Sequence, residues 1–219
     1  MRIVIQIVVF AIVGVLIWLL IDSIREPITF QNEYDSRQRT VVKRLEILQD
    51  LQQMHRGLRD EYANTFDTLA DVLRDGRFPV LSVTEDPENP GEFRYDTVRY
   101  IPAIDSAVAV GVSLLKPDEV SLGTPQQFDI VMQRVRKVPF REDGLEFEMK
   151  ADTITYQQVR GVPVVQVLTP VNTFMGKYAD PKYKKYDRFY NPDDDTEFDT
   201  YYIGFGSMRK PSTSGNWEN

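Results

Sequence analysis

The chain has 219 residues, of which 42% are hydrophobic and 27% are charged, so its composition is typical of a globular protein and not of a disordered or fibrous one. It contains no cysteine and one histidine, which excludes disulfides, thiol chemistry and zinc sites built on cysteine. Its net charge of −7, without a basic stripe, argues against nucleic-acid binding.

An almost unbroken apolar run occupies residues 3–21 and predicts a transmembrane helix. Its 19 residues would extend roughly 28 Å as an α-helix, close to the ~30 Å hydrocarbon core of a bilayer. Trp18 lies near one end, where aromatic side chains meet the headgroups. A cleaved signal peptide is the alternative, but the run is long for one and no small-residue cleavage site follows it. We therefore assign residues 1–24 to an uncleaved membrane anchor.

The charges near this span give a weak orientation signal. Arg2 precedes it and Arg25, Arg37 and Arg39 follow it, which by count alone favours a cytoplasmic C-terminal side. Long C-terminal domains, however, cross membranes largely regardless of such charges, and a short N-terminal tail is typical of a signal anchor. We expect a single-pass protein of a bacterial inner membrane with its C-terminal domain in the periplasm.

Residues 25–76 are predicted to form a helical stalk and a short helix. Pro27 is expected to break or kink the chain, after which apolar positions recur every three or four residues. A period close to 3.5 predicts an amphipathic helix of roughly 30 residues whose apolar seam packs on its own domain, on a partner helix or on both. The seam consists of Val41, Leu45, Leu48, Leu51, His55, Leu58 and Tyr62. We interpret His55 as a packed or interfacial histidine and not as a catalytic base.

The short helix is predicted from the segment NTFDTLADVLRDG. Asn64 or Thr65 can cap its N-terminus, Asp67 in the first turn complements the helix dipole, and Gly76 is expected to end it. Its apolar face consists of Phe66, Leu69, Val72 and Leu73.

Residues 77–175 are predicted to be rich in strands, because the hydrophobic period changes to two after Gly76. Pro163 restricts the strand around it to a sheet edge or a strand start. Strands are expected over residues 78–83, 93–101, 128–138, 145–149 and 162–168, whereas residues 107–115 fit either a buried strand or a short helix. The fold class is thus α+β: a transmembrane helix and a long amphipathic helix, followed by a small antiparallel sheet domain of about four to seven strands.

Residues 176–219 are predicted to form a C-terminal arm rich in aromatic and acidic residues. Between residues 178 and 205 nine side chains are aromatic. The arm either packs its rings on the chain's own sheet or docks on a neighbouring subunit. Tyr201, Tyr202 and Trp217 are the residues best suited to reach a partner, because such side chains are rigid amphipathic anchors at interfaces.

No motif for catalysis or for metal binding stands out. Carboxylates alternate over residues 193–199 but do not match an EF-hand, so we interpret them as a solvated acidic loop and not as a calcium site. The chain has no glycine-rich phosphate loop, no G-x-S-x-G and no H-E-x-x-H, and no carboxylate pair is singled out for glycoside hydrolysis. We therefore predict no catalytic residue, no metal site and no cofactor.

The order of these parts resembles the pilins and pseudopilins of type IV pilus and type II secretion systems. The correspondence lies over residues 41–73, above all in the sequence EYANTFDTL at 61–69, which is similar to the turn and short helix of that family. The stalk pattern and the closing GNWE at 215–218 also resemble uncharacterised membrane-anchored proteins of Bacteroidetes. The family's processing site and its glutamate inside the apolar helix have no counterpart, since Gln6 is the nearest polar residue. The resemblance implies a pilin-like scaffold subunit in place of a fibre-forming pilin.

Taken together, the sequence predicts a non-enzymatic structural subunit of a bacterial envelope assembly, such as a pilus-like, secretion or motility machine. Its expected partners are the membrane and other protein subunits, in a homo- or hetero-oligomer. The candidate interface residues are Leu48, Leu51, His55, Leu58, Tyr201, Tyr202 and Trp217. The alternative is a membrane-tethered periplasmic domain that binds a ligand or acts as a sensor.

Overall fold

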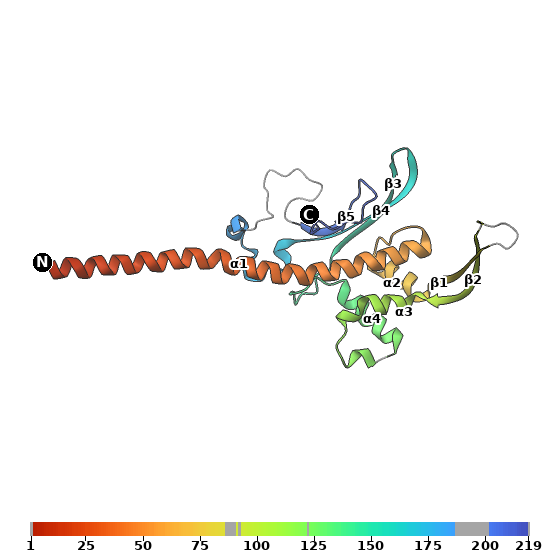
Figure 1. Cartoon of the computed structure of the whole chain (residues 1–219), viewed down its shortest axis with the longest axis horizontal. Helices are drawn as coiled ribbons and strands as arrows, with labels where there is room; N and C mark the ends of the chain where they lie inside the picture. The colour runs from red at the N-terminus through yellow and green to blue at the C-terminus, as the bar shows by residue number, and fades with distance from the viewer. Residues whose placement is uncertain (1, 86–90, 92, 122, 187–201, 219) are drawn as a thin grey trace.

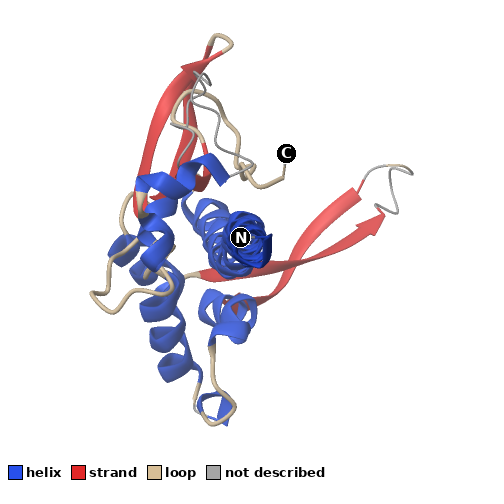
Figure 2. Ribbon diagram, turned by 90° about the vertical axis from the view of Figure 1, so that its left-hand side faces the viewer, coloured by secondary structure: helices blue, strands red, loops and turns tan. Residues whose placement is uncertain are grey.

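The computed structural model describes residues 2–85, 91, 93–121, 123–186 and 202–218. Over these residues the fold is α+β, built around one very long N-terminal helix and two small antiparallel sheets (Figure 1). The three-stranded sheet and the shorter helices lie on different sides of the long helix, as the view along its axis shows (Figure 2). The long helix is therefore the element on which the rest of the chain is assembled.

Helix α1 spans Arg2–Arg59 without interruption, so the expected break at Pro27 is wrong. A proline inside a helix removes one backbone N–H and crowds the carbonyl four residues earlier. Here that carbonyl belongs to Ser23, an exposed residue, where solvent can replace the missing donor. The helix continues on both sides of Pro27, and Thr29 Oγ1 also donates to the Arg25 carbonyl. The predicted anchor and the predicted stalk are consequently one continuous helix.

The C-terminal half of α1 is buried along the predicted seam. Val41, Leu45, Leu48 and Leu51 are completely buried, and His55 is 1% exposed. The helix ends at Arg59, and Asp60 adopts a left-handed conformation (φ 61°) whose N–H donates to the Arg56 carbonyl. The predicted burial of the seam is confirmed for these five residues. Leu58 is half-buried, and Tyr62 is buried but lies in the loop after the helix.

Helix α2, Phe66–Asp75, begins as the sequence predicts. Thr65 is its N-cap, and its hydroxyl accepts a hydrogen bond from the Thr68 N–H. The loop before it is fixed to α1 by Gln52, a completely buried residue whose amide both donates to and accepts from the backbone of Ala63, each at 2.9 Å. This pair satisfies a buried polar side chain and holds α2 against α1.

The next two strands form a hairpin that projects from the end of the molecule opposite the N-terminus (Figure 1). Strand β1 (Arg77–Glu85) pairs with strand β2 (Phe93–Pro102) in an antiparallel two-stranded sheet. Both strands are confirmed. The register shifts between Val80 and Leu81, which places one extra residue, Val98, on β2.

The chain then returns through two helices. Helix α3 (Ala103–Gly111), extended by a short 3₁₀ turn, resolves the ambiguity of residues 107–115 in favour of a helix. Helix α4 (Thr124–Val135) contradicts the strand expected over 128–138. Phe128, Val131, Met132 and Val135, all buried, follow each other at i, i+3, i+4 and i+7, which is the spacing of one helical face.

The second sheet has the order β3–β4–β5, with β3 at Glu148–Tyr156, β4 at Val159–Pro170 and β5 at Tyr202–Gly206. The strand expected from residue 145 begins three residues later, since only an isolated bridge joins Glu146 to Lys137 before it. Pro163 lies in the central strand, but β5 pairs only with residues 166–170 of β4. At Pro163 the strand is therefore still a sheet edge, as the sequence predicts.

The described part of the C-terminal arm packs on its own chain. Phe205 is completely buried in β5, and residues after it turn back along the free edge of that strand. Asn216 is hydrogen-bonded to both neighbours of Ile203. Its backbone N–H donates to the Gly204 carbonyl, its Oδ1 accepts from the Gly204 N–H, and its Nδ2 donates to the Tyr202 carbonyl. Residues 187–201, which include the acidic segment 193–199, lie outside the described residues.

Candidate functional site

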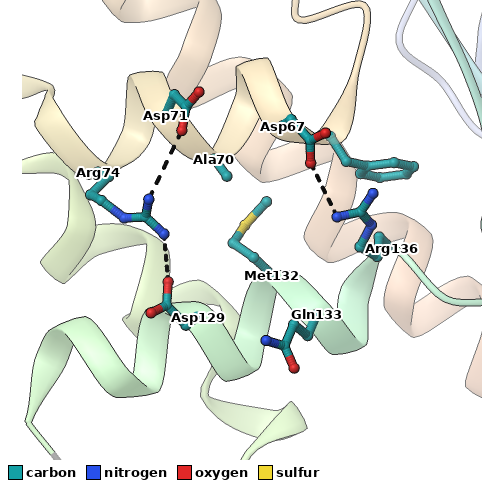
Figure 3. Close-up of a pocket in the computed structure, with 9 residues that line it drawn as sticks. Asp67, Ala70, Asp71, Arg74, Asp129, Met132, Gln133 and Arg136 are labelled. Atoms are coloured by element: carbon teal, nitrogen blue, oxygen red, sulfur yellow. Dashed lines mark hydrogen bonds and ion pairs between the residues drawn. The ribbon is translucent and has the colours of Figure 1, made fainter.

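A shallow cleft of about 380 Å³ lies between α2 and α4 (Figure 3). Apolar side chains and alternating charges line it. From α2 come Phe66, Asp67, Ala70, Asp71 and Arg74, and from α4 and the residue after it come Asp129, Met132, Gln133 and Arg136. The cleft is the place where a ligand would fit if the chain were a binding domain.

Both arginines of this cleft are paired with carboxylates. Arg74 Nη2 lies 2.6 Å from Asp129 Oδ1, and Arg136 contacts Asp67 at 3.2 Å and Glu146 at 2.6 Å. Both guanidinium groups also stack on aromatic rings, Arg136 over Phe66 and Arg74 over Phe128. These arginines join the two helices, and both cations among the lining residues are already paired.

His55 is buried at the contact between α1 and the loop after it. Its Nδ1–H donates to the Glu61 carbonyl at 2.8 Å, because a carbonyl oxygen can only accept. Nε2 is buried and has no hydrogen-bond partner among the described residues. The histidine is therefore a packed residue here, and no group positioned for proton transfer adjoins it among the hydrogen bonds of the described chain.

The N-terminal half of α1 exposes a continuous apolar surface. Ile3, Phe10 and Trp18 are 72%, 76% and 64% exposed, whereas Leu45 in the other half of the same helix is completely buried. Among the described residues α1 is the helix long and apolar enough to cross a membrane, a property that signal sequences share.

A second exposed apolar surface lies on the β1–β2 hairpin. Leu81, Val83, Phe93 and Tyr100 are between 49% and 61% exposed. The pairing of the strands puts these four residues on one face, because residues opposite each other in an antiparallel ladder share a face. The other face carries Ser82, Thr84 and Asp96 near the tip, and Phe78 near the body, where it packs on the core. We call the first set the apolar hairpin face.

A third feature surrounds α1 where its exposed half ends. Residues 176–186, in two 3₁₀ turns, place Tyr178, Tyr183 and Tyr186 around Phe30 of α1, with ring centroids 5.9 to 6.2 Å apart. Tyr183 stacks on Phe30 with an interplanar angle of 10°. We call residues 176–186 the aromatic collar.

The predicted interface residues fall mostly inside the molecule. Leu48, Leu51 and His55 are covered by the chain's own core, and Leu58 is half-buried beside Gly76. Tyr202 and Trp217 are half-buried, Trp217 with its ring against Gly215, and Tyr201 lies outside the described residues. The structure thus packs the seam residues within the chain and leaves the apolar hairpin face as an exposed surface that the sequence analysis missed.

Comparisons of this chain with protein-family models, with curated proteins and with solved structures found no match. The function is therefore argued from the geometry.

Proposed function

We propose that this chain is a non-enzymatic, single-pass membrane subunit of a bacterial envelope assembly of the pilus-like, secretion or motility kind, with its α+β domain on the periplasmic side of the inner membrane. The observation that carries the proposal is helix α1. One uninterrupted helix exposes an apolar surface over its first half and forms the centre of the core with its second half.

The exposed half of α1 requires an apolar environment. Seventeen large apolar side chains between Ile3 and Ile28 are exposed in the isolated chain. At roughly 1.5–3 kcal/mol for each side chain removed from water, their burial would contribute about 25–50 kcal/mol. That is several times the usual stability of a folded domain. A hydrocarbon core of ~30 Å is long enough to cover residues 3–21 of this segment, roughly 28 Å of helix, which supports membrane insertion over a free helix in solution.

The continuity of α1 supports a structural role. Because no flexible linker separates the apolar half from the buried half, the domain is held at a fixed height and rotation relative to the anchor. Such rigidity suits a scaffold subunit, which has to present a surface in a defined place. The apolar hairpin face provides that surface, with four large side chains exposed on a strand pair that extends beyond the body.

The cleft between α2 and α4 supports the alternative, a ligand-binding or sensor domain, less well. Its arginines are already paired with Asp129, Asp67 and Glu146, so an anionic ligand would have to break these ion pairs to bind.

The test is the mass of the complex that the intact chain forms when it is extracted from its own membranes in mild detergent. We expect native mass spectrometry to show a complex larger than one chain. Replacing Leu81 and Val83 together by Ser should abolish that complex while leaving the melting temperature unchanged, because both side chains are exposed. Thr84→Ala, on the opposite face of the same strand, is the matched control and should preserve the complex. A single chain that binds a small molecule and has no protein partner would support the alternative.

A further inference from the structure

The aromatic collar is fastened to α1 just after its apolar run. The Tyr186 hydroxyl donates to Glu26 Oε2 at 2.9 Å, and Gln31 Nε2 donates to the Tyr186 carbonyl. Phe30, which is 1% exposed, fills the centre of the collar. Since side chains of α1 hold the collar through both polar and aromatic contacts, its height along the helix is fixed.

The collar is a basic segment in an acidic chain. Residues 176–186 contain four lysines and one aspartate, whereas the whole chain has a net charge of −7. Lys177, Lys182 and Lys185 are exposed, and each ammonium group lies over the ring of the following tyrosine, 4.6 to 4.9 Å from its centroid. No carboxylate of the described residues forms a salt bridge with these three lysines.

The helix geometry gives the height of these charges. With a rise of 1.5 Å per residue, Glu26 lies ~7.5 Å and Phe30 ~13.5 Å beyond Ile21, the last residue of the apolar run. The headgroup layer extends roughly 5–8 Å beyond the hydrocarbon core, and charges act over a Debye length of about 8–10 Å. The Tyr183 hydroxyl, and after it the carboxylates of Asp180 and Glu26, raise the pKa of Lys182. Because the Tyr186 hydroxyl donates to Glu26 Oε2, this end of the collar lies at the height of the headgroups.

We propose that the aromatic collar is a binding surface for the headgroups of anionic phospholipids. The inference rests on the proposed function, because a lipid surface adjoins the collar only if residues 3–21 span the membrane. The lysine ammonium groups pair with lipid phosphates, and the tyrosines occupy the interface, where amphipathic rings are favoured. Because the collar is bound to α1 through Phe30, Gln31 and Glu26, headgroup binding also sets the depth of the anchor and the height of the domain.

The test uses the intact chain reconstituted into phosphatidylcholine vesicles that carry either spin-labelled phosphatidylglycerol or spin-labelled phosphatidylcholine. Electron paramagnetic resonance measures the fraction of each lipid that the protein immobilises. We expect a preference of roughly threefold for the anionic lipid, reduced in 1 M salt because the Debye length falls to about 3 Å. The triple variant Lys177→Gln, Lys182→Gln, Lys185→Gln should lose the preference, and the three Lys→Arg replacements should keep it.

A matched control removes the same charge elsewhere. Lys116, Lys150 and Lys210 are exposed lysines of the body, so replacing these three by Gln should leave the lipid preference unchanged. Equal immobilisation of the two lipids by the wild-type chain, or a preference that survives in the collar variant, would overturn the inference.

The two proposals fail in different ways. A chain that floats with the vesicles, resists carbonate extraction and shows no lipid preference refutes the collar as a lipid-binding surface but leaves the membrane subunit intact. A chain that does not insert refutes the anchor, and the lipid inference falls with it.

Discussion

Gly76 shows how a single residue can fit a prediction for a different physical reason. The sequence indicates it as the end of α2, and α2 does end at Asp75. The usual reason is the left-handed conformation that glycine adopts easily, but Gly76 has φ −68°, which any residue adopts. What requires glycine is space, since a Cβ atom there would lie 2.5 Å from Leu58 Cδ1 and 2.6 Å from the Val72 carbonyl oxygen.

Two glycines of the same region should therefore respond in opposite directions to alanine. Gly76→Ala is expected to lower the free energy of unfolding by about 1–3 kcal/mol, because backbone and a buried contact must shift. Gly57→Ala should raise it by up to about 1 kcal/mol, because alanine favours the helix interior. The nearest atom to its Cβ, Phe78 Cε1, would lie at an ordinary 3.6 Å. Denaturation of the intact chain in detergent, followed by circular dichroism, measures both. The explanation is wrong if the free energy of unfolding changes in the same direction in both variants.

At the level of helices and strands, local sequence patterns predict some elements of the fold and not others. The seam of α1, the cap of α2 and both hairpin strands follow from side-chain period and capping chemistry, so they were predictable. Helix α4 was misassigned because Val131, Val135 and Val138 are β-branched residues and favour a strand reading, although the burial period is helical. Continuity through Pro27 was not predictable from propensity, since it depends on long helical segments on both sides.

The loop between α3 and α4 contains an ion pair that should make the stability of the protein depend on pH. Arg134 donates through both Nη groups to the Glu119 carboxylate, which also accepts from the Lys116 N–H. The Arg134 hydrogen bonds, and after them that of Lys116, lower the pKa of Glu119 below its ordinary value of 4.5. A carboxyl with a lowered folded pKa contributes stability above its unfolded value, and that contribution is lost as the pH falls through the folded value.

The expected result is a difference in melting temperature between wild type and Glu119→Gln that is constant from pH 7 down to about pH 4.5 and disappears at lower pH. Wild type should have the higher melting temperature within that range. Asp118→Asn, the neighbouring residue, removes a carboxylate without removing the hydrogen bonds that Arg134 donates to Glu119 and should give a smaller difference. A Glu119→Gln difference that persists unchanged at pH 3 would show that shape, and not charge, holds the loop.

At the scale of the whole molecule, the candidate surfaces could be predicted only in part. The apolar run of residues 3–21 is contiguous in sequence, so its exposure on α1 follows directly from composition. The apolar hairpin face could not be predicted, because the sequence around Leu81 and Phe93 does not show whether another part of the chain covers these residues. The aromatic collar could not be predicted, because its position along the molecule depends on Phe30, almost 150 residues earlier in the chain.

The placement of the whole chain can be tested cleanly because it has no native cysteine. In spheroplasts, a membrane-impermeant maleimide should label Val159→Cys, which replaces a residue that is 61% exposed on the body. Ile12→Cys, in the middle of the apolar run, should react only after the membrane is dissolved, because the hydrocarbon core excludes the charged reagent. Labelling of Val159→Cys only after lysis would place the domain in the cytoplasm. An intact mass that lacks residues 3–21 would instead show that the apolar half of α1 is a cleaved signal, and the continuous helix that carries the proposed function would not exist in the mature protein.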